Sequence, residues 1–471
     1  MKKISRKLFL KKAAAGLAAL AVSPALLSCD ESDAGSRKIR KLAPLAGRYD
    51  VVIAGGGPAG FIAAIAAARQ GAKTAIVERY GFFGGMATIG YVAPISVFAL
   101  KNELVIGGIP WEFVKRLESM GGAFIEWPKA NIDFDVELYK LCCQRMIREA
   151  GVDMYMHSAM IGCEMEGKRI ETVIIENKNG LETLASKVFI DCTGDGDLAY
   201  MAGARYMSGQ DGTGIMQPCT LMFTVTNYNL EKFLDFAEQS PENFGIKEDY
   251  AKGYDPTFFR ASRGHCFIGM DELIKKAKAK GDFHVPRNQF IHITTPVDGM
   301  LAINTSRIIE IDASDPYQLS KGLEEGYLQV RELMAFMNKY LPGFEQAQLA
   351  GISPTLGVRE TRHFVGVKRL THETMYAPET KREAVAQSAY NIDIHSGVKD
   401  HIDLTPVAEP FGIPYGCLVP ESLNGLLLSG RTISVDTQVF ASARVMGPCI
   451  AVGEAAGTAA AMSVDKGIEL R

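Results

Sequence analysis

The sequence predicts an α/β fold in which a βαβ unit and a β-meander form one domain, with an α+β segment inserted into it. Two short apolar runs, DVVIA and KTAIVE, flank a glycine turn and a helix-like stretch of small residues. Three strand-like runs joined by glycine turns lead up to residue 191, and helical and strand-like patterns alternate through residues 206–350. With 471 residues, 47% hydrophobic and 22% charged, the chain has a globular composition and room for more than one domain.

The βαβ unit spans residues 49–79 and carries a dinucleotide-binding pattern. Gly55, Gly57 and Gly60 form G-x-G-x-x-G between the first strand and the helix FIAAIAAARQG. We expect Gly55 to make the tight turn, Gly57 to let the backbone approach a pyrophosphate, and Gly60 to let helix and strand pack closely. Glu78 ends the second strand and is placed to accept hydrogen bonds from a ribose. The phosphates would then face the helix N-terminus, where free N–H groups favour an anion. The unit is therefore Rossmann-like.

The segment RYGFFGGMAT, residues 79–88, adds a second glycine turn directly after the ribose-binding acid. Such a turn lets the backbone lie against a long, extended dinucleotide. No second G-x-G-x-x-G follows a strand anywhere in the sequence. A separate NAD(P)H domain of the disulfide-reductase kind is therefore not expected.

The loop DCTGDGD, residues 191–197, packs three carboxylates and two glycines behind the meander MIGCEMEG, RIETVIIENKNG and ETLASKVFI. It partly fits a calcium loop, but Ala202 stands where the closing acid would be. The sequence therefore predicts no metal site and a loop that returns the chain to the dinucleotide. Gly194 permits a close approach there, and we expect Asp195 or Asp197 to cap the next helix.

A second part of the site is expected near the C-terminus. GLLLSGRTIS, residues 425–434, is typical of a buried strand ending at a glycine. A helix of small residues is predicted from Pro448, close against the first helix. Its N-terminus, near Met446 and Gly447, would point at an anionic group such as the pyrimidine edge of a reduced flavin.

These motifs carry a family resemblance over about residues 48–465. GGGPAG with Glu78, GGMAT, DCTGDGDLA, GVRETRHFVG, IPYGCLVP and GRTIS…ARVMGPCIAVGEAAGTAAA resemble the FAD-dependent oxidoreductase family. That family belongs to the glutathione-reductase-like superfamily and is distantly related to fumarate reductase flavoproteins. The resemblance implies FAD as cofactor, and it implies that FAD is lined by Gly55, Gly57, Gly60, Glu78, Gly85, Met86, Thr193, Gly194, Gly430, Arg431, Arg444 and Met446.

The same resemblance divides the chain into an FAD-binding domain and an inserted domain. The expected FAD-binding domain comprises residues 48–205 and 351–471. The middle segment, residues 206–350, has none of the family motifs and would form an α+β capping domain. In relatives such a domain closes over the flavin and supplies substrate specificity.

Candidate catalytic residues come from two strand-like runs, GVRETRHFVG and NIDIHSG. Hydride transfer to or from a flavin needs a group that moves the hydroxyl proton and cations that hold an anion or developing charge. We expect Arg359 and Arg362 to anchor the substrate, and His395 or His363 to transfer the proton. The alternative is that Arg362 and His363 form salt bridges or contact FAD phosphates.

The predicted function is hydride transfer between flavin N5 and a small organic substrate, either an organic acid or a sugar or polyol. The electron donor or acceptor is unknown; a quinone and oxygen remain open, and no haem motif C-x-x-C-H is present. The alternative in another class is a non-catalytic dinucleotide- or ligand-binding lipoprotein. Stabilising a reduced flavin would serve no purpose in such a protein.

The N-terminus predicts export and a lipid anchor. MKKISRKLFLKK is basic and AAAGLAALAVSPALL is apolar, as in a signal peptide of residues 1–28. The following LLSC resembles a bacterial lipoprotein signal, so Cys29 would be lipidated. The lipid would anchor the protein to the bacterial envelope, in the periplasm or at the cell surface. Residues 29–47 form a polar tether. SRKLFLK is similar to a twin-arginine signal with Lys7 in place of the second arginine, which leaves the export route open.

Charge and cysteine spacing exclude several partner classes. The chain has 51 Lys and Arg against 54 Asp and Glu, and six of the basic residues lie in the signal peptide, which has no acid. A mature chain this acidic is not expected to bind nucleic acid. None of the nine cysteines forms C-x-x-C, so zinc, iron–sulfur and redox-disulfide sites are not predicted.

Overall fold

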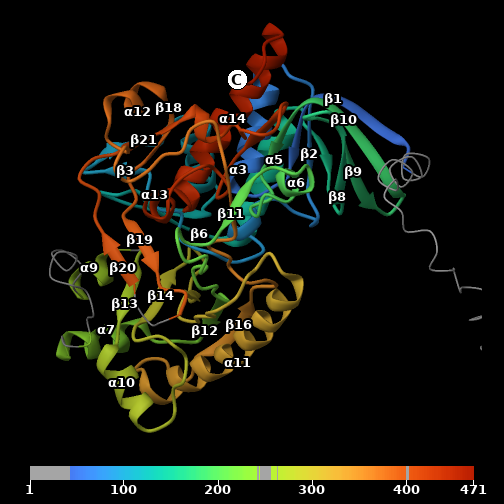
Figure 1. Cartoon of the computed structure of the whole chain (residues 1–471). Coiled ribbons are helices and arrows are strands. Elements are labelled where there is room, and N and C mark those ends of the chain that lie inside the picture. The colour runs from blue at the N-terminus through green and yellow to red at the C-terminus, as the bar shows by residue number, and fades with distance from the viewer. Residues whose placement is uncertain (1–42, 241–242, 244–255, 263, 399–401) are drawn as a thin grey trace, which may run out of the picture. The chain divides into compact units, whose positions relative to one another are not determined.

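The predicted βαβ unit forms the start of a seven-stranded sheet. The computed structural model describes residues 43–240, 243, 256–262, 264–398 and 402–471 (Figure 1), so the predicted signal peptide and Cys29 lie outside the described residues. Strand β1 (Leu45–Ala54) leads into helix α3 (Pro58–Arg69), and β2 (Thr74–Val77) returns parallel to β1. The second half of β1 and the whole of β2 are buried, and their side chains there are mostly Val, Ile and Ala on both faces.

The meander completes this sheet, as predicted. The strand order is β7-β2-β1-β10-β9-β8, with β22 (Leu426–Leu428) also paired to β10. Strand β10 (Gly180–Asp191) runs parallel to β1, pairs antiparallel with β9 through its first half, and pairs parallel with β22 at its end. The carboxyl ends of β1, β10 and β22 thus meet at one edge, together with that of β2. The remaining members are β7 (Asp153–Tyr155), β8 (Ala159–Glu166) and β9 (Arg169–Asn177).

The small-residue helix α14 (Met446–Lys466) packs against α3, as predicted. A Cβ added at Gly453 or Gly457 would overlap backbone atoms of Ala59 or Ala63, so the two helices touch through their backbones. The helix starts two residues before Pro448, which corrects the expected start. Val445 is the extended N-cap, and the proline still falls in the first turn, where its missing N–H costs nothing.

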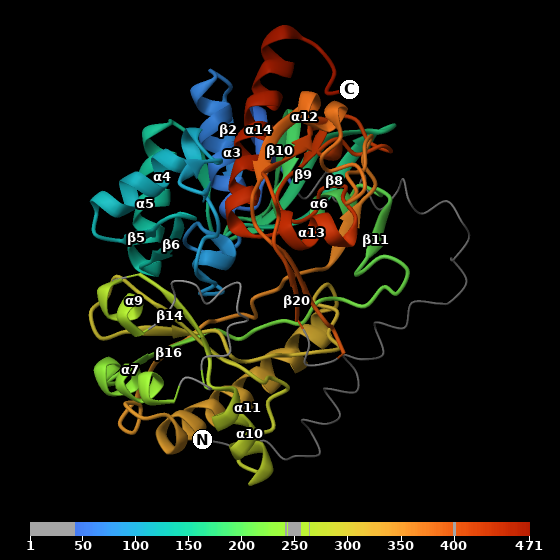
Figure 2. The same ribbon diagram turned by 90° about the vertical axis from the view of Figure 1, so that its left-hand side faces the viewer.

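Two further helices and short hairpins flank α3 (Figure 2). Helices α4 (Gly108–Ser119) and α5 (Val136–Glu149) pack against each other and against α3. The chain between them forms the hairpin of β5 (Ala123–Glu126) and β6 (Asn131–Phe134). Smaller elements nearby are the 3-10 turn η2 (Gly85–Ala87) and the pair β3 (Ala99–Leu100) and β4 (Glu103–Leu104).

The middle segment builds a second sheet with its own core, in the lower half of Figure 1. Its strand order is β13-β14-β15-β12-β16, all antiparallel. We call this sheet and its helices the cap; its buried apolar cluster runs from Cys219 to Val358. Its members are β12 (Phe223–Thr226), α7 (Leu230–Gln239), α9 (Pro256–Ala261), β13 (Cys266–Gly269), α10 (Asp271–Ala279), β14 (Phe290–Thr294), β15 (Leu301–Ile303), α11 (Pro316–Tyr340) and β16 (Gln348–Ile352).

Short hairpins follow the cap in the chain, and one of them contacts it. Strand β19 (Ile392–His395) pairs with β20 (Ile402–Thr405), and this hairpin reaches the cap, where Glu310 N donates to Gly397 O. The other elements are α6 (Asp197–Met201), β11 (Tyr206–Ser208), which pairs with β17 (Arg362–Phe364), α12 (Pro378–Glu383), β18 (Ala384–Ser388), which pairs with β21 (Phe411–Pro414), η4 (Tyr415–Cys417) and α13 (Thr437–Ala443).

Among the described helices, none is by itself long and apolar enough to cross a membrane. Helices α13 and α14 meet that test only when taken together, and they join at a bend of 90°.

Candidate flavin site

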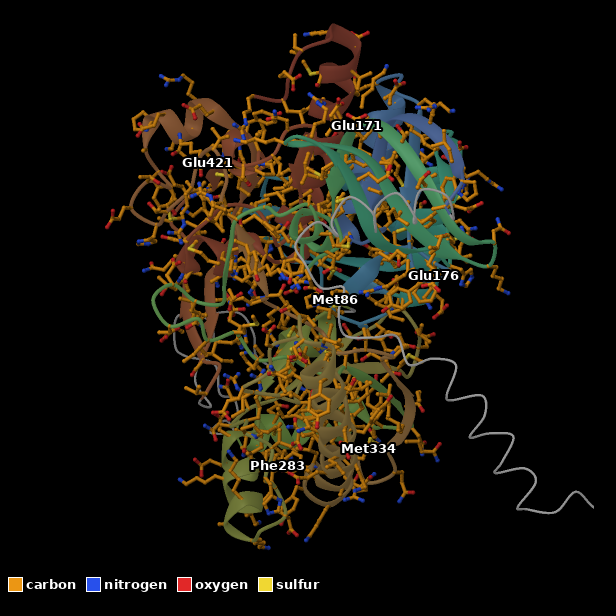
Figure 3. All side chains as sticks on the ribbon, turned by 45° about the vertical axis from the view of Figure 1, so that its right-hand side comes forward. Met86, Glu171, Glu176, Phe283, Met334 and Glu421 are labelled. Atoms are coloured by element: carbon orange, nitrogen blue, oxygen red, sulfur yellow. The ribbon has the colours of Figure 1, made fainter. Side chains whose placement is uncertain are left out.

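A cavity of about 680 Å³ lies where the carboxyl ends of the parallel strands face the cap. Its wall includes the turns after β1, β2, β10 and β22 on one side and residues of β13 and β14 on the other. Met86, labelled in Figure 3, lines it where the two sheets approach each other. The volume is in the range typical of cofactor and ligand sites.

Two glycines of the G-x-G-x-x-G motif do different jobs. Gly57 is the N-cap of α3, and a Cβ there would meet protein atoms no closer than 3.9 Å, namely Cys192 O and Gly85 Cα. Its open side therefore faces the cavity, as close approach of a pyrophosphate requires. Gly60 does not line the cavity. A Cβ there would overlap the carbonyl oxygen of Gly55, so this glycine serves helix–strand packing.

Glu78 is held in place by backbone donors at the end of β2. Its Oε2 accepts from Gly56 N at 2.8 Å and its Oε1 from Tyr80 N at 2.9 Å. Burial raises the pKa of Glu78, and the bonds from Tyr80 and Gly56 oppose that rise. The side chain lines the cavity, and each carboxylate oxygen keeps a lone pair for a ribose hydroxyl.

The loop DCTGDGD is fastened by its first carboxylate. Asp191 Oδ1 accepts from Thr193 N and Thr193 Oγ1 at 3.0 and 2.8 Å, and its Oδ2 accepts from Ala199 N at 2.8 Å. The expectation that Asp195 or Asp197 caps the next helix is wrong. Gly196, with positive φ, is the N-cap of α6, and the Thr193 hydroxyl accepts from Asp197 N instead.

Asp195 instead connects the loop to the C-terminal half of the chain. Its Oδ1 accepts from Arg431 Nη2 at 2.9 Å and from Thr361 Oγ1 at 2.8 Å. Arg431 Nη1 and Arg444 Nε are buried and have no hydrogen-bond partner among the described residues, and both arginines line the cavity. Such donors fit a large anionic, polar cofactor, because an unmet buried donor is costly.

Of the three candidate catalytic residues in the segment GVRETRHFVG, one lines the cavity. Arg359 lines it, with Nη1 donating to Pro218 O at 2.6 Å and to Thr220 Oγ1 at 2.8 Å. Arg362 and His363 are not among the lining residues. Arg362 pairs with Asp197 at 3.0 Å and lies over the Tyr200 ring. His363 pairs with buried Glu360 at 3.0 Å and packs on Phe440. These contacts match the salt-bridge alternative for Arg362 and His363.

A buried Asp–His–Arg cluster includes two residues of the second candidate run, NIDIHSG. His395 Nε2 lies 3.0 Å from Asp393 Oδ2, which also accepts from Arg444 Nη2 at 3.0 Å. On the far side of the ring, Arg307 Nη1 lies 3.5 Å from His395 Nδ1, and Arg307 Nη2 donates to Ser396 O. Asp393, His395 and Arg444 all line the cavity. Sequence reasoning missed Asp393, although an Asp two positions before a His in a strand places both side chains on one face.

Electrostatics set the charge state of this cluster. Burial lowers the pKa of His395 to about 3; the charges of Arg359 and Arg444 act in the same direction and Asp393 against it. Burial opposes ionisation of Asp393, but His395, Arg444 and Arg359 hold the pKa of its carboxyl below the usual range. His395 is therefore neutral and Asp393 ionised at neutral pH. Since the carboxylate accepts the Nε2 proton, the imidazole lone pair is on Nδ1.

The structure gathers most of the predicted site residues around one cavity. Gly60, Arg362 and His363 lie away from its wall. Those that line it are Gly55, Gly57, Glu78, Gly85, Met86, Thr193, Gly194, Arg359, His395, Gly430, Arg431, Arg444 and Met446.

Two curated relatives match short stretches of the chain. It is 54% identical over 46 residues to the dihydrolipoyl dehydrogenase of Trypanosoma brucei brucei, which is 10% of each chain. It is 31% identical over 109 residues to that of Acholeplasma laidlawii, covering 23% of this chain and 32% of the relative. The matched stretches thus span at most about a third of these curated relatives.

Solved structures are similar at low identity. The p-nitrophenol 4-monooxygenase PnpA of Pseudomonas putida DLL-E4 aligns with a TM-score of 0.46 and 10% identity, covering 89% of this chain and 81% of that one. The model of the FAD dependent oxidoreductase family matches residues 50–471. The chain therefore belongs to the FAD dependent oxidoreductase family and is an FAD-dependent enzyme.

Proposed function

We propose that this enzyme transfers a hydride between FAD and a small organic substrate, with His395 moving the accompanying proton and Arg359 holding the substrate. The observation that carries the proposal is the Asp393–His395 pair on the wall of the same cavity that the nucleotide-binding turns line. Bound FAD supplies a hydride acceptor or donor at N5. The chain's own residues must then position the substrate and manage its proton.

His395 is arranged as a general base whose orientation is fixed. Asp393 accepts the Nε2 proton, so a substrate hydroxyl entering beside the ring would give its proton to Nδ1. Arg307 Nη1, at 3.5 Å, is too far from Nδ1 to make a strong hydrogen bond. Once protonated, the imidazolium would be stabilised by the carboxylate of Asp393. In the opposite direction the same Nδ1 would return the proton.

The charge around His395 links proton transfer to substrate binding. Arg359 is one of the positive charges that lower the pKa of His395. An anion bound to Arg359 would cancel that charge and raise the pKa, which makes His395 a better base when substrate is present.

Anaerobic mixing of the FAD-loaded protein with hydroxy acids and polyols tests the proposal. We expect at least one substrate to bleach the flavin absorption band, or its oxidised product to restore the band after chemical reduction. His395→Gln should slow that step about 100-fold or more without loss of FAD. The matched control is His372→Gln, on an exposed residue. FAD binding with no reaction across the panel, or equal rates in both variants, would refute the proposal in favour of a binding protein.

We also propose that the enzyme is exported and anchored to the bacterial envelope by lipidated Cys29. The support is the basic and apolar pattern of residues 1–28 followed by LLSC. Growth with radiolabelled palmitate should label the wild-type chain and not Cys29→Ala, which should leave the membrane fraction. An unlabelled wild-type chain would refute the anchor.

A further inference from the structure

One face of the cap sheet forms an apolar floor for the cavity. Cys266 and Ile268 of β13 pair with Ile293 and Ile291 of β14, and all four line the cavity. Alternate residues of a strand share a face. The intervening residues face the other way: Phe267 and His292 stack at 5.1 Å between ring centres within the core of the cap.

The floor becomes polar in one direction. Gln289 and Arg287 lie just before β14, beyond its Phe290 end, and both line the cavity. A ligand lying along β14 would therefore contact apolar side chains at one end and polar or cationic ones at the other. An extended polyol is a poor fit, because its hydroxyl groups would lie on the isoleucines without partners.

Arg359 supplies a cation without a carboxylate partner. Its guanidinium hydrogen bonds go to Pro218 O and Thr220 Oγ1, which are both neutral. By contrast, Arg431 and Arg444 each pair with an aspartate. No carboxylate among the described residues lies within 4.0 Å of Arg359. A half-buried guanidinium in this state is costly unless a ligand brings the anion.

The surroundings of Arg359 increase the demand for an anion. Burial, together with the positive charges of Arg444, Arg287 and Arg307, lowers the pKa of Arg359 to about 9, while Asp393 acts against them. The planar fork of arginine matches a carboxylate, which it can bind through two parallel hydrogen bonds. The apolar floor lines the same cavity as Arg359, so an anion bound there could carry an apolar body.

We propose that the substrate is a small carboxylic acid with an apolar body, its carboxylate bound by Arg359 and its body lying on the floor of Cys266, Ile268, Ile291 and Ile293. This inference rests on the proposed function, because it concerns the same cavity, and it selects the organic acid over the sugar or polyol.

Binding can be measured without turnover from the change in the flavin absorption spectrum when unreactive probes are added. The probes are hexanoate, acetate, hexan-1-ol and glucose, added to the FAD-loaded protein at the same ionic strength. We expect hexanoate to bind at least about 10-fold more tightly than acetate, since four further methylene groups would lie on the floor. Hexan-1-ol and glucose should cause no saturable change in the same range.

Variants assign the two parts of the site. Arg359→Gln should weaken hexanoate binding by about 10- to 100-fold, and Arg359→Lys should weaken it less. Ile291→Ser should weaken hexanoate while leaving acetate binding unchanged, and it serves as a second test where Arg359→Gln fails to fold. The control is Arg369→Gln, whose arginine pairs with Asp211 on the surface.

Three results would overturn the inference. The first is glucose or hexan-1-ol binding as well as hexanoate. The second is an Arg359→Gln variant that binds FAD more weakly but, once saturated with FAD, binds hexanoate as tightly as wild type. That result would assign Arg359 to the flavin. The third is Ile291→Ser weakening hexanoate and acetate equally. Carboxylate binding without any flavin reaction would leave this inference standing and refute the proposed hydride transfer.

Discussion

Replacing Gly57 or Gly60 of the nucleotide-binding turn by alanine should have two different effects. In Gly57→Ala the new methyl group would meet Cys192 O and Gly85 Cα at 3.9 Å, which is ordinary contact, and would point into the cavity. In Gly60→Ala it would overlap the carbonyl oxygen of Gly55 and lie 3.1 Å from Cys192 Cβ. The first variant should therefore keep its stability and bind FAD weakly, whereas the second should lose stability.

The expected magnitudes follow from these contacts. Gly57 has φ −68° and ψ −173°, which alanine adopts without strain, so the stability of the FAD-free protein should change by less than about 1 kcal/mol. The methyl group would separate the backbone from the pyrophosphate and remove a charge-assisted hydrogen bond, which corresponds to about a 10- to 100-fold loss of affinity. Overpacking at Gly60 against a backbone atom should cost about 3 kcal/mol.

FAD titration followed by fluorescence quenching gives the affinity, and thermal unfolding of the FAD-free protein gives the stability. Wild-type FAD affinity in Gly57→Ala would refute the placement of the pyrophosphate. Loss of both properties in both variants would refute the division of roles between the two glycines.

Three further substitutions test the packing and the charges. Gly457→Val should leave little folded protein on expression, because its side chain would overlap the Ala63 carbonyl oxygen where α14 meets α3. Burial raises the pKa of Asp133 to about 7, so the folded chain keeps a proton that the unfolded chain releases near 3.8. As the pH rises from about 4 to about 7, wild type should therefore lose on the order of 4 kcal/mol of unfolding free energy relative to Asp133→Asn, measured by thermal unfolding. A difference that does not change with pH would contradict this. Asp393→Asn leaves Arg444 without its carboxylate, so it should lower the unfolding free energy by about 3–5 kcal/mol and slow flavin reduction; unchanged values would refute the cluster.

Local patterns were sufficient to predict the nucleotide-binding part of the fold. The βαβ unit, the meander and the small-residue helix α14 form where their apolar runs and glycines indicate, because each pattern is complete within a short stretch of chain. The predicted division at residues 206 and 350 stays a prediction; the apolar core of the cap extends from Cys219 to Val358.

The wall of the substrate site could be predicted only in part. Arg307 and His395 are 88 residues apart, and their contact depends on how the cap meets the β19–β20 hairpin, which no local pattern encodes. The sequence groups Arg362 and His363 with Arg359 only because the three are close along the chain. In β17 the first two turn to opposite sides, toward Asp197 and Glu360, and only Arg359 of the three lines the cavity.

The most direct test of the account is anaerobic, rapid-mixing reduction of the FAD-loaded enzyme by a series of 2-hydroxy acids with increasingly long apolar chains, in wild type and His395→Gln. The account predicts that the flavin band bleaches in wild type, that the apparent Kd falls as the chain lengthens, and that His395→Gln binds the acids with similar affinity but reduces about 100-fold more slowly. The account would be contradicted if no acid of the series reduced the flavin and no matching 2-oxo acid reoxidised the reduced flavin. It would also be contradicted if His395→Gln reacted as fast as wild type.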